Sequence, residues 1–270
     1  MVSLDPAPGI SREDLLGVNV CAINPAIALH EIETWIQKRE PHYICATGVH
    51  GVMEAWKNRE VKKALNQAGL VTPDGMPLVW FLRFKGYSQV SRVYGPDLLL
   101  AVCERSMKTG WSHYFYGGAE GVPERLVRNL KRRFPELKVA GMESPPFRPL
   151  SEEEDHWAVE RINASNADIL WVGLGTPKQD LWMAAHRPEI TTPVMIGVGA
   201  AFDFHAGVKP QAPLWMQRSG LEWLFRLLTE PKRLWKRYFY IIPSFTILVL
   251  LQILGILPKH PEDEFRHERL

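Results

Sequence analysis

The chain has few cysteines and lacks the short motifs that mark several common enzyme classes. Its three cysteines, Cys21, Cys45 and Cys103, are widely spaced and set among apolar residues, which argues against a disulfide framework and against a zinc site. No HExxH motif, Cys/His metal spacing, DxD pair or GxSxG elbow occurs. The sequence therefore favours a reaction without a metal and disfavours serine-hydrolase chemistry. GxGxxG is also missing, which weakens the hypothesis of a nicotinamide dehydrogenase.

A targeting signal is also missing at the start of the sequence. Residues 1–14, MVSLDPAPGISRED, have no basic start followed by an apolar run, so we expect no signal peptide and a body that stays in the cytoplasm. The net charge of +2 gives no indication of a nucleic-acid partner. The local charge pattern does indicate a partner, the membrane. Lys232, Arg233, Lys236 and Arg237 directly precede residues 238–257, which carry no charge.

Apolar runs alternate with segments of helical period along most of the chain. With 270 residues and 46% hydrophobic content, the chain is long enough for one substantial domain with its own core. The alternation predicts an α/β fold, a Rossmann-like parallel sheet with helices on both faces, over residues 1–210. The predicted strand and helix pairs are VNVCAI with PAIALHEIETWIQ, HYICATG with a helix to about Ala68, SHYFYGG with PERLVRNLKRRF, ADILWVGLG with PKQDLWMAAH, and TPVMIGVGAAFDF with the C-terminal helices.

The character of the sequence changes near Pro213. The following segment, PLWMQRSGLEWLFRLLTEPKRLWKRYF, is amphipathic and rich in Trp and Arg, so residues 211–270 are predicted to form a helical appendage. Residues 238–257 are long enough to cross a membrane, but Pro243 and Gln252 are among the residues that dilute their apolar character. We expect this segment either to lie on the bilayer or to enter it, and a buried core helix remains the alternative.

The stretch VGLGTPKQDLW, residues 172–182, has the build of an anion-binding junction between a strand and a helix. It leaves an apolar run, turns on two glycines and is predicted to enter a helix at Pro177. The start of a helix leaves backbone N–H groups unpaired, and glycine lets a ligand approach the backbone. A diphosphate would fit this junction, although similar turns occur in α/β proteins that bind nothing there.

Other polar residues also follow predicted strands, where open α/β sheets bind their ligands. Asp74 stands in a Pro-Asp-Gly turn and either only makes that turn or acts on a substrate. Asp203, between two aromatic residues, either contacts a ligand or caps a turn. His50 and His205 are left without an assigned role, and Asp97 is interpreted as a helix-start residue.

Six segments in a fixed order carry a resemblance to a known family. They are ATGVHGVMEA at 46–55, AGLVTPDGMPLVW at 68–80, RVYGPDLL at 92–99, YGG at 116–118, VGLGTPKQDLW, and GVGAAFDFHAG at 197–207. Together they resemble the WecG/TagA/CpsF family of bacterial glycosyltransferases. The segment LEWLFRLLTEPKRLWKRYF, from Leu221, looks like the C-terminal appendage of that family.

The resemblance implies transfer of a sugar from a UDP-sugar to a polyprenyl-diphosphate-linked saccharide, with inversion and without a metal or other cofactor. The expected place is the cytoplasmic face of the plasma membrane, and the expected product is a precursor of exopolysaccharide, common antigen or teichoic acid. The appendage would bind membrane lipid. A homo-oligomer, the sugar transferred and the acceptor linkage stay open.

The resemblance also implies roles for individual residues. Asp74 would be the general base and Thr47 would assist near the sugar, so these two are the predicted catalytic residues. Arginines of the appendage would close over the diphosphate. Together with the strand ends, this predicts a substrate-binding set of Gly95, Gly117, Gly118, Gly175, Thr176, Lys178, Gln179, Asp203, Arg226, Arg233 and Arg237.

Two other functions stay open on the sequence. A nucleotide-dependent oxidoreductase is compatible with a Rossmann-like domain, and a membrane-tethered scaffold of a polysaccharide complex is compatible with the appendage. Bound NAD without UDP-sugar turnover would favour the former, and failure to bind any UDP-sugar would favour the latter.

Overall fold

The computed structural model describes residues 9–257. Residues 1–8 of the predicted domain and 258–270 of the predicted appendage lie outside the described residues. The strands are β1 (Arg12–Leu15), β2 (Val18–Cys21), β3 (His42–Thr47), β4 (Leu70–Pro73), β5 (Ser112–Gly117), β6 (Lys138–Glu143), β7 (Ile169–Gly173) and β8 (Val194–Gly197). The helices are α1 (Pro25–Lys38), α2 (Val49–Lys57), α3 (Arg59–Asn66), α4 (Met76–Phe84), α5 (Gly95–Thr109), α6 (Val122–Arg133), α7 (Glu152–Ala164), α8 (Lys178–His186), α9 (Ala201–His205), α10 (Leu214–Arg218), α11 (Glu222–Thr229) and α12 (Pro231–Ile253).

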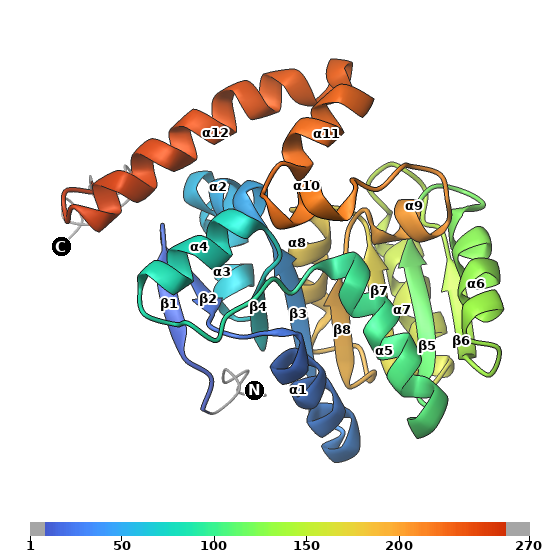
Figure 1. Cartoon of the computed structure of the whole chain (residues 1–270). Coiled ribbons are helices and arrows are strands. Elements are labelled where there is room, and N and C mark those ends of the chain that lie inside the picture. The colour runs from blue at the N-terminus through green and yellow to red at the C-terminus, as the bar shows by residue number, and fades with distance from the viewer. Residues whose placement is uncertain (1–8, 258–270) are drawn as a thin grey trace.

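Six strands form the central sheet (Figure 1) in the order β4-β3-β8-β7-β5-β6, and every neighbouring pair is parallel. This confirms the predicted α/β fold with a parallel sheet. From β5 the chain proceeds to β6 on one side, and from β7 it proceeds to β8 on the other. The strand order therefore reverses between β5 and β7, which is where ligands bind in open α/β sheets.

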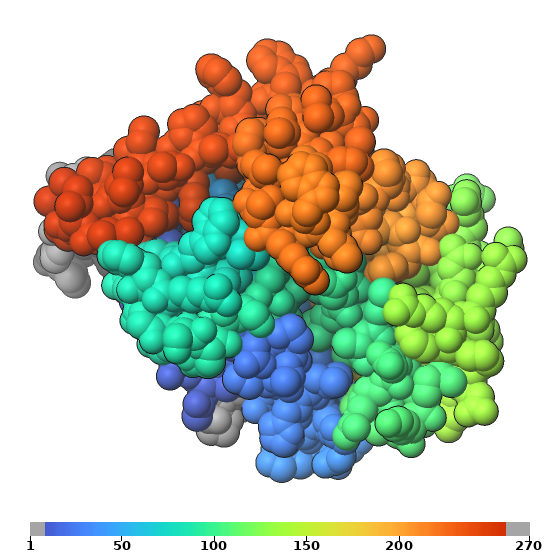
Figure 2. All heavy atoms as spheres, in the orientation of Figure 1, coloured from blue at the N-terminus to red at the C-terminus, as the bar shows by residue number. Residues whose placement is uncertain are grey.

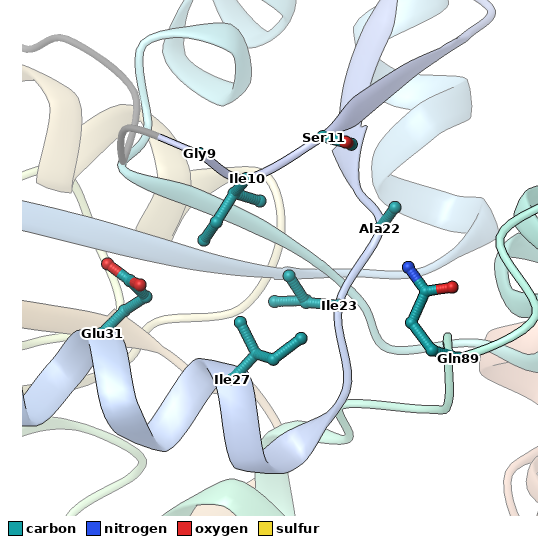
Figure 3. A pocket seen from close by; sticks show the side chains of 8 residues that line it. All are labelled: Gly9, Ile10, Ser11, Ala22, Ile23, Ile27, Glu31 and Gln89. Atoms are coloured by element: carbon teal, nitrogen blue, oxygen red, sulfur yellow. The ribbon is translucent and has the colours of Figure 1, made fainter.

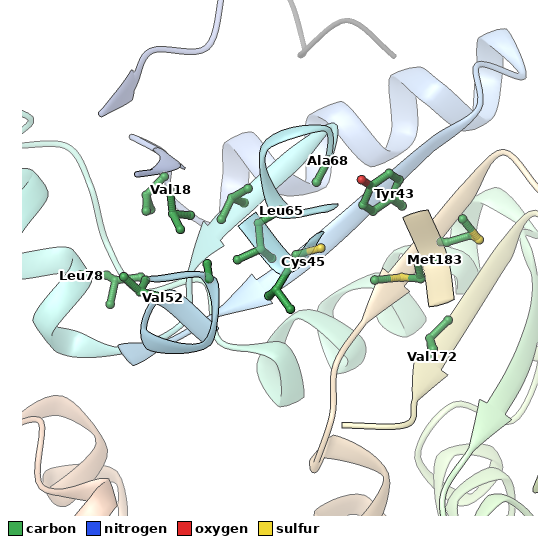
Figure 4. Close-up of a cluster of buried hydrophobic side chains, with 14 of the residues drawn as sticks. Val18, Tyr43, Cys45, Val52, Leu65, Ala68, Leu78, Val172 and Met183 are labelled. Carbon is green, nitrogen blue, oxygen red and sulfur yellow. The ribbon is translucent and has the colours of Figure 1, made fainter. Parts of the chain in front are cut away.

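The strands alternate between two buried cores, one on each face of the sheet. In β3, Tyr43 and Cys45 belong to one core and Ile44 belongs to the other, as the period of two along a strand requires. Figure 4 shows part of the first core, in which Cys45 lies with Val52 of α2 and Leu65 of α3. Helices α2, α3 and α8 cover this face, while α1, α5 and α6 cover the other. Burial on both faces explains why the strands read as continuous apolar runs.

The structure corrects the prediction for the first strand. Residues 18–21 were predicted to open the parallel sheet, but β2 pairs antiparallel with β1 in a separate two-stranded sheet. Arg12 fixes this hairpin to the turn between α3 and β4, because its Nη2 donates to Ala68 O at 3.0 Å and to Gly69 O. A short apolar run does not specify its pairing partner, so the alternation could not separate the two sheets.

Strand β6 and the break between α2 and α3 were not predicted. β6 is the edge strand and alternates between exposed and half-buried residues, so it lacks the apolar run that identifies the inner strands. The segment after β3 was predicted as one helix, but it divides at Asn58. The Asn58 side chain caps α3 by accepting from Glu60 N at 2.9 Å, and Asn is a strong N-cap.

The appendage comprises α10, α11 and α12, which lie across the end of the molecule where the strand arrows point (Figures 1 and 2). Helix α12 packs one side onto the body through Ile241 and Phe245, which are buried and belong to the first core. Near its end, Gln252 accepts from Leu16 N at 3.0 Å and donates to Asp14 O at 2.9 Å. These contacts attach α12 to the body at several points along its length. The domain boundary at residue 210 remains a prediction.

Candidate active site

The carboxyl ends of the parallel strands carry many of the residues predicted from the sequence. Thr47 ends β3, Asp74 follows β4, and Gly117 ends β5. Gly95 begins α5 close to the ends of β3 and β8, since a Cβ there would lie 3.3 Å from Val198 O and 3.5 Å from Ala46 Cβ. The predicted residues that lie at or just beyond these strand ends are Thr47, Asp74, Gly95, Gly117, Gly118, Gly175, Thr176, Lys178, Gln179 and Asp203.

Asp74 is held by its backbone and leaves its carboxylate for contacts beyond the local turn. Its N–H donates to Thr47 O at 3.0 Å, which joins the ends of β4 and β3. Helix α4 begins after Gly75 without any side-chain cap, so the carboxylate is not used there. Instead Oδ2 accepts from Gly95 N at 3.3 Å, and Oδ1 lies 3.4 Å from Arg92 Nη2. The Pro-Asp-Gly turn therefore presents the carboxylate at the site.

The environment of Asp74 raises its affinity for protons. Burial raises the pKa of Asp74 to about 6, the positive charge of Arg92 opposes this rise, and the negative charge of Glu222 adds to it. The side chain is still 21% exposed, so a ligand can reach it. A carboxylate with a pKa near neutrality is suited to accept a proton from a substrate hydroxyl group.

Two charged residues at this site were not singled out from the sequence, Arg92 and Glu222. Arg92 Nη2 lies 2.5 Å from Glu222 Oε2, and Tyr94 donates its hydroxyl to Glu222 Oε1 at 3.0 Å. The Arg92 guanidinium also stacks 3.7 Å from the centroid of the Tyr94 ring. Both residues fall within segments that carried the family resemblance, and only the contact between them identifies them as one cluster with Asp74.

Glycines bring the ends of β5 and β7 together at the reversal of strand order. Gly117 has φ +130°, and a Cβ there would lie 2.5 Å from the Gly173 carbonyl carbon. Gly118 donates its N–H to Gly173 O at 3.0 Å. By contrast, a Cβ on Gly175, which has φ +79°, would meet nothing within 4 Å. The first two glycines therefore serve close packing of the strand ends, while Gly175 leaves room beside the backbone.

Gln179 braces two loops of the site. Its side chain is buried, and Oε1 accepts from Gly175 N at 3.2 Å and from Gly199 N at 2.9 Å. It therefore shapes the wall between the loops after β7 and β8. The predicted helix start at Pro177 is confirmed to within one residue, because Pro177 is the N-cap of α8. Lys178 is exposed, with Nζ 5.2 Å from the centre of the Phe147 ring.

Most helices that follow strands of the sheet begin without a side-chain cap, and α7 after β6 is an exception. Of the described helices, α2, α4, α5, α6, α8 and α9 lack this cap, as do α10, α11 and α12 of the appendage. Helices α1, α3 and α7 are capped by Asn24, Asn58 and Ser151. Uncapped helix starts keep backbone N–H groups and positive dipole ends directed at one region, which suits an anionic ligand such as a diphosphate.

The appendage places two of its three predicted arginines near His50. Burial, together with the positive charges of Arg237, Arg226 and Lys57, lowers the pKa of His50 to about 4. This concentration of positive charge at the start of α2 favours an anionic ligand. Arg233 instead forms an ion pair with Glu230 and has a half-exposed side chain.

The remaining predicted residues make mainly structural contacts. The Thr47 side chain is buried, and its hydroxyl donates to Cys45 O at 3.2 Å. Asp203 forms an ion pair with Lys209 at 2.7 Å, and its backbone carbonyl accepts from Val208 N at 2.9 Å. His205 contacts Pro96 O through Nε2 at 2.9 Å, which ties α9 to α5. Among the described residues, no group of three or more His, Cys, Asp or Glu is placed to hold a metal.

A cavity of about 270 Å³ lies away from these residues, between the segment before β1 and helix α1 (Figure 3). Ile23, Ile27, Glu31 and Gln89 are among its lining residues. Neither Asp74 nor any glycine of the strand ends lines it, so it adds nothing to the site described here.

Asp180, one residue after Gln179, is a fully buried carboxyl group beneath the loop. Burial raises its pKa to about 7 from the ordinary 3.8, and hydrogen bonds with Cys45 and Thr176 oppose the rise. The folded protein thus binds this proton more tightly than the unfolded chain does. The resulting contribution to stability is present at low pH and is lost as pH rises from about 4 to about 7.

We therefore expect Asp180→Asn to flatten the dependence of stability on pH. The loss in free energy of unfolding between pH 5 and pH 8 should shrink by roughly 2 kcal/mol, because the shift from 3.8 to about 7 corresponds to a few kcal/mol at most. Urea denaturation of both proteins at the two pH values measures this difference. Parallel pH profiles for the two proteins would contradict the burial of an ionisable group at this position.

The comparisons agree with this geometry. The family model for the glycosyl transferase WecG/TagA/CpsF family matches residues 13–257. A protein of Bacillus spizizenii, named N-acetylglucosaminyldiphosphoundecaprenol N-acetyl-beta-D-mannosaminyltransferase, is 29% identical over 221 residues, which is 82% of this chain and 83% of the relative. The oxidoreductase and scaffold hypotheses gain no support. The chain belongs to the WecG/TagA/CpsF family and is a glycosyltransferase.

Proposed function

We propose that the protein transfers an N-acetylmannosaminyl group from its UDP-sugar to polyprenyl-diphosphate-linked N-acetylglucosamine, with inversion of the anomeric centre. The acceptor and the sugar are those in the name of the Bacillus spizizenii relative. The observation that carries the proposal is the Asp74 carboxylate, which lies at the carboxyl ends of the parallel strands and has a pKa of about 6. The product would serve the assembly of a cell-surface polysaccharide.

In this mechanism one displacement completes the transfer. The acceptor hydroxyl gives its proton to Asp74 while its oxygen forms a bond to the anomeric carbon. The bond from that carbon to the diphosphate oxygen breaks, and UDP leaves with the electron pair. Attack from the side opposite to the leaving group inverts the configuration. The uncapped helix starts and the appendage arginines would stabilise the charge that develops on UDP.

We further propose that α12 lies on the cytoplasmic membrane surface instead of crossing the bilayer. It is the one described helix long and apolar enough to span a membrane. Yet Ile241 and Phe245 on its inner side are buried against the body, and Gln252 is hydrogen bonded to the β1–β2 hairpin. Crossing a bilayer would break these contacts, whereas lying flat keeps them.

The opposite side of α12 offers the membrane-contacting surface. Its apolar residues recur at helical spacing on one face and are at least half exposed; we call them the outer stripe, and they are Phe239, Ile247, Leu250 and Leu254. Lys232 and Lys236 precede the stripe on the same helix. An apolar stripe preceded by basic residues is typical of a helix that lies in the interface of an anionic membrane.

One prediction separates the binding of diphosphate by the appendage from the binding of lipid. Arg237→Ala should lower turnover by about 10- to 100-fold in detergent with a short-chain acceptor, since an arginine contact with a phosphate contributes about 1.5 to 3 kcal/mol. Lys236→Ala is the matched control. It removes a neighbouring cation, which lies over Trp235, and should change vesicle binding alone. Equal kinetics for the two variants would leave Arg237 with only a membrane role.

The proposed function is tested by UDP release from a panel of UDP-sugars. UDP-N-acetylmannosamine should be used with a short polyprenyl-diphosphate N-acetylglucosamine acceptor, and NMR of the product should show an anomeric configuration opposite to that of the donor. Faster turnover of another UDP-sugar would correct the donor, and retained configuration would reject the single displacement. UDP binding without acceptor-dependent release would reject the transfer itself.

A further inference from the structure

Helix α11 lies over the site without fully burying any of its residues. None of its eight residues, Glu222–Thr229, is fully buried, although Leu224, Phe225 and Leu227 are partly buried. Gly220, just before it, packs against Trp80 of α4, where a Cβ would lie 2.6 Å from the ring. A short ion pair between α11 and the body is made by its first residue, Glu222.

Glu222 binds the body through two groups that also surround Asp74. Its two oxygens meet Arg92 at 2.5 Å and the Tyr94 hydroxyl at 3.0 Å. The side chains of Arg92 and Glu222 are only 15% and 16% exposed, so solvent screens this ion pair less than a pair on the surface. Its position in the first turn of α11 also places the carboxylate at the positive end of the helix.

Arg92 is shared between two carboxylates. It donates through Nε to Asp74 O, and its Nη2 lies 3.4 Å from Asp74 Oδ1 but 2.5 Å from Glu222 Oε2. With Glu222 in place, the guanidinium charge is directed chiefly to the appendage. Without Glu222, the same charge would be available to Asp74 alone, and an Asp74 carboxylate paired with Arg92 would be a weaker base.

We propose that Glu222 is a positioning residue that docks α11 over the site by binding Arg92 and thereby leaves the Asp74 carboxylate free to accept the proton of the acceptor. The inference rests on the proposed role of Asp74 as the base. The appendage would then have a second role besides binding anions. When α11 docks, Glu222 binds Arg92 and leaves the Asp74 carboxylate able to accept a proton.

The electrostatics around Asp74 agree with this role. The negative charge of Glu222 raises the pKa of Asp74, in addition to the larger effect of burial, while Arg92 and the Gly95 N–H oppose the rise. The Tyr94 hydroxyl, the Asp97 carboxyl and the Tyr238 hydroxyl of α12 also face this cluster. Burial raises the pKa of each, and the negative charge of Glu222 adds to the rise. Removal of the Glu222 charge therefore lowers the proton affinity of Asp74.

Glu222→Gln tests the proposal in the full chain. It keeps the size of the side chain and an acceptor for Tyr94, but removes the charge that holds Arg92. We expect kcat to fall about tenfold. In the pH profile of kcat, the fall on the acidic side should move to lower pH. Backbone amides of residues 222–229 should exchange with deuterium faster. Glu33→Gln is the matched control. It breaks an ion pair of similar geometry with Arg105 at 2.8 Å, between α1 and α5, and should change neither kinetics nor exchange in α11.

A double variant shows whether Glu222 acts through Arg92. In an Arg92→Gln background, Glu222→Gln should have little further effect on kcat, whereas full additivity would overturn the proposed route. An unchanged kcat and an unchanged pH profile in the single variant would overturn the proposal as a whole. Failure of the base hypothesis is distinguishable, because it would show as near-normal turnover of Asp74→Asn, which this inference does not alter.

Discussion

Asp74→Asn is expected to lower turnover by about 10² to 10⁴, the usual contribution of general base catalysis, with little change in UDP-sugar affinity. Asparagine keeps the size of the side chain and favours the same kind of turn. Its amide can still accept the hydrogen bond from Gly95 N, which Asp74 accepts at 3.3 Å, but it cannot accept a proton. Steady-state kinetics and calorimetric titration with UDP measure the two effects separately.

The same residue sets the pH dependence of the wild-type enzyme. The base must be ionised, and burial raises the pKa of Asp74 to about 6, so kcat should fall as pH drops through about 6. The residual activity of Asp74→Asn should lack this fall at low pH.

Asp168→Asn is the matched control. Asp168 immediately precedes β7, at the amino-terminal ends of the strands and away from the site, and pairs with Arg39. The substitution should lower stability and leave kcat unchanged. Near-normal turnover by folded Asp74→Asn would reject the base, and a parallel loss of UDP binding would assign Asp74 to the donor.

Substitution of Ile247 and Leu250 by Glu is expected to weaken binding to anionic vesicles by about 100-fold or more. The two side chains are 57% and 53% exposed in the outer stripe, and burying each in a membrane contributes about 1.5 to 3 kcal/mol. The substitutions leave Ile241 and Phe245, which pack on the body, in place. Vesicle sedimentation in high salt measures the apolar contribution, because salt screens the basic residues.

Trp157→Glu provides the control for this change. Trp157 is 49% exposed, but it belongs to α7 in the body, so vesicle binding should persist. Turnover of the Ile247 and Leu250 variant with a soluble acceptor should match the wild type. A truncation after about Tyr238 is expected to free the protein from membranes too, although it also removes Ile241 and Phe245 from the core. Undiminished sedimentation of the double variant would reject the outer stripe as the contact surface.

The sequence predicted the inner strands of the sheet and the polar residues at their carboxyl ends, since both follow from local patterns. The apolar runs of the inner strands predict a sheet buried on both faces, and the observed alternation of Tyr43, Ile44 and Cys45 between two cores explains those runs. The Pro-Asp-Gly turn and the glycines near 117 and 175 predict a ligand site at the carboxyl ends of the strands. Edge strand β6 was missed because it lacks a continuous apolar run. The strand at residues 18–21 was predicted, but its pairing with β1 was not, because a short apolar run does not specify its partner.

By itself, the sequence determined the α/β class, the appendage and a set of polar residues at strand ends, because these follow from composition and short-range periodicity. Only the tertiary structure decided which of these residues share an environment. The ion pair of Arg92 with Glu222 joins positions 130 residues apart, and no local pattern specifies it. The packing of α12 also decided which side remains exposed, since its inner and outer sides are both apolar. Burial and nearby charge, which depend on the folded chain, then set the proton affinity of Asp74.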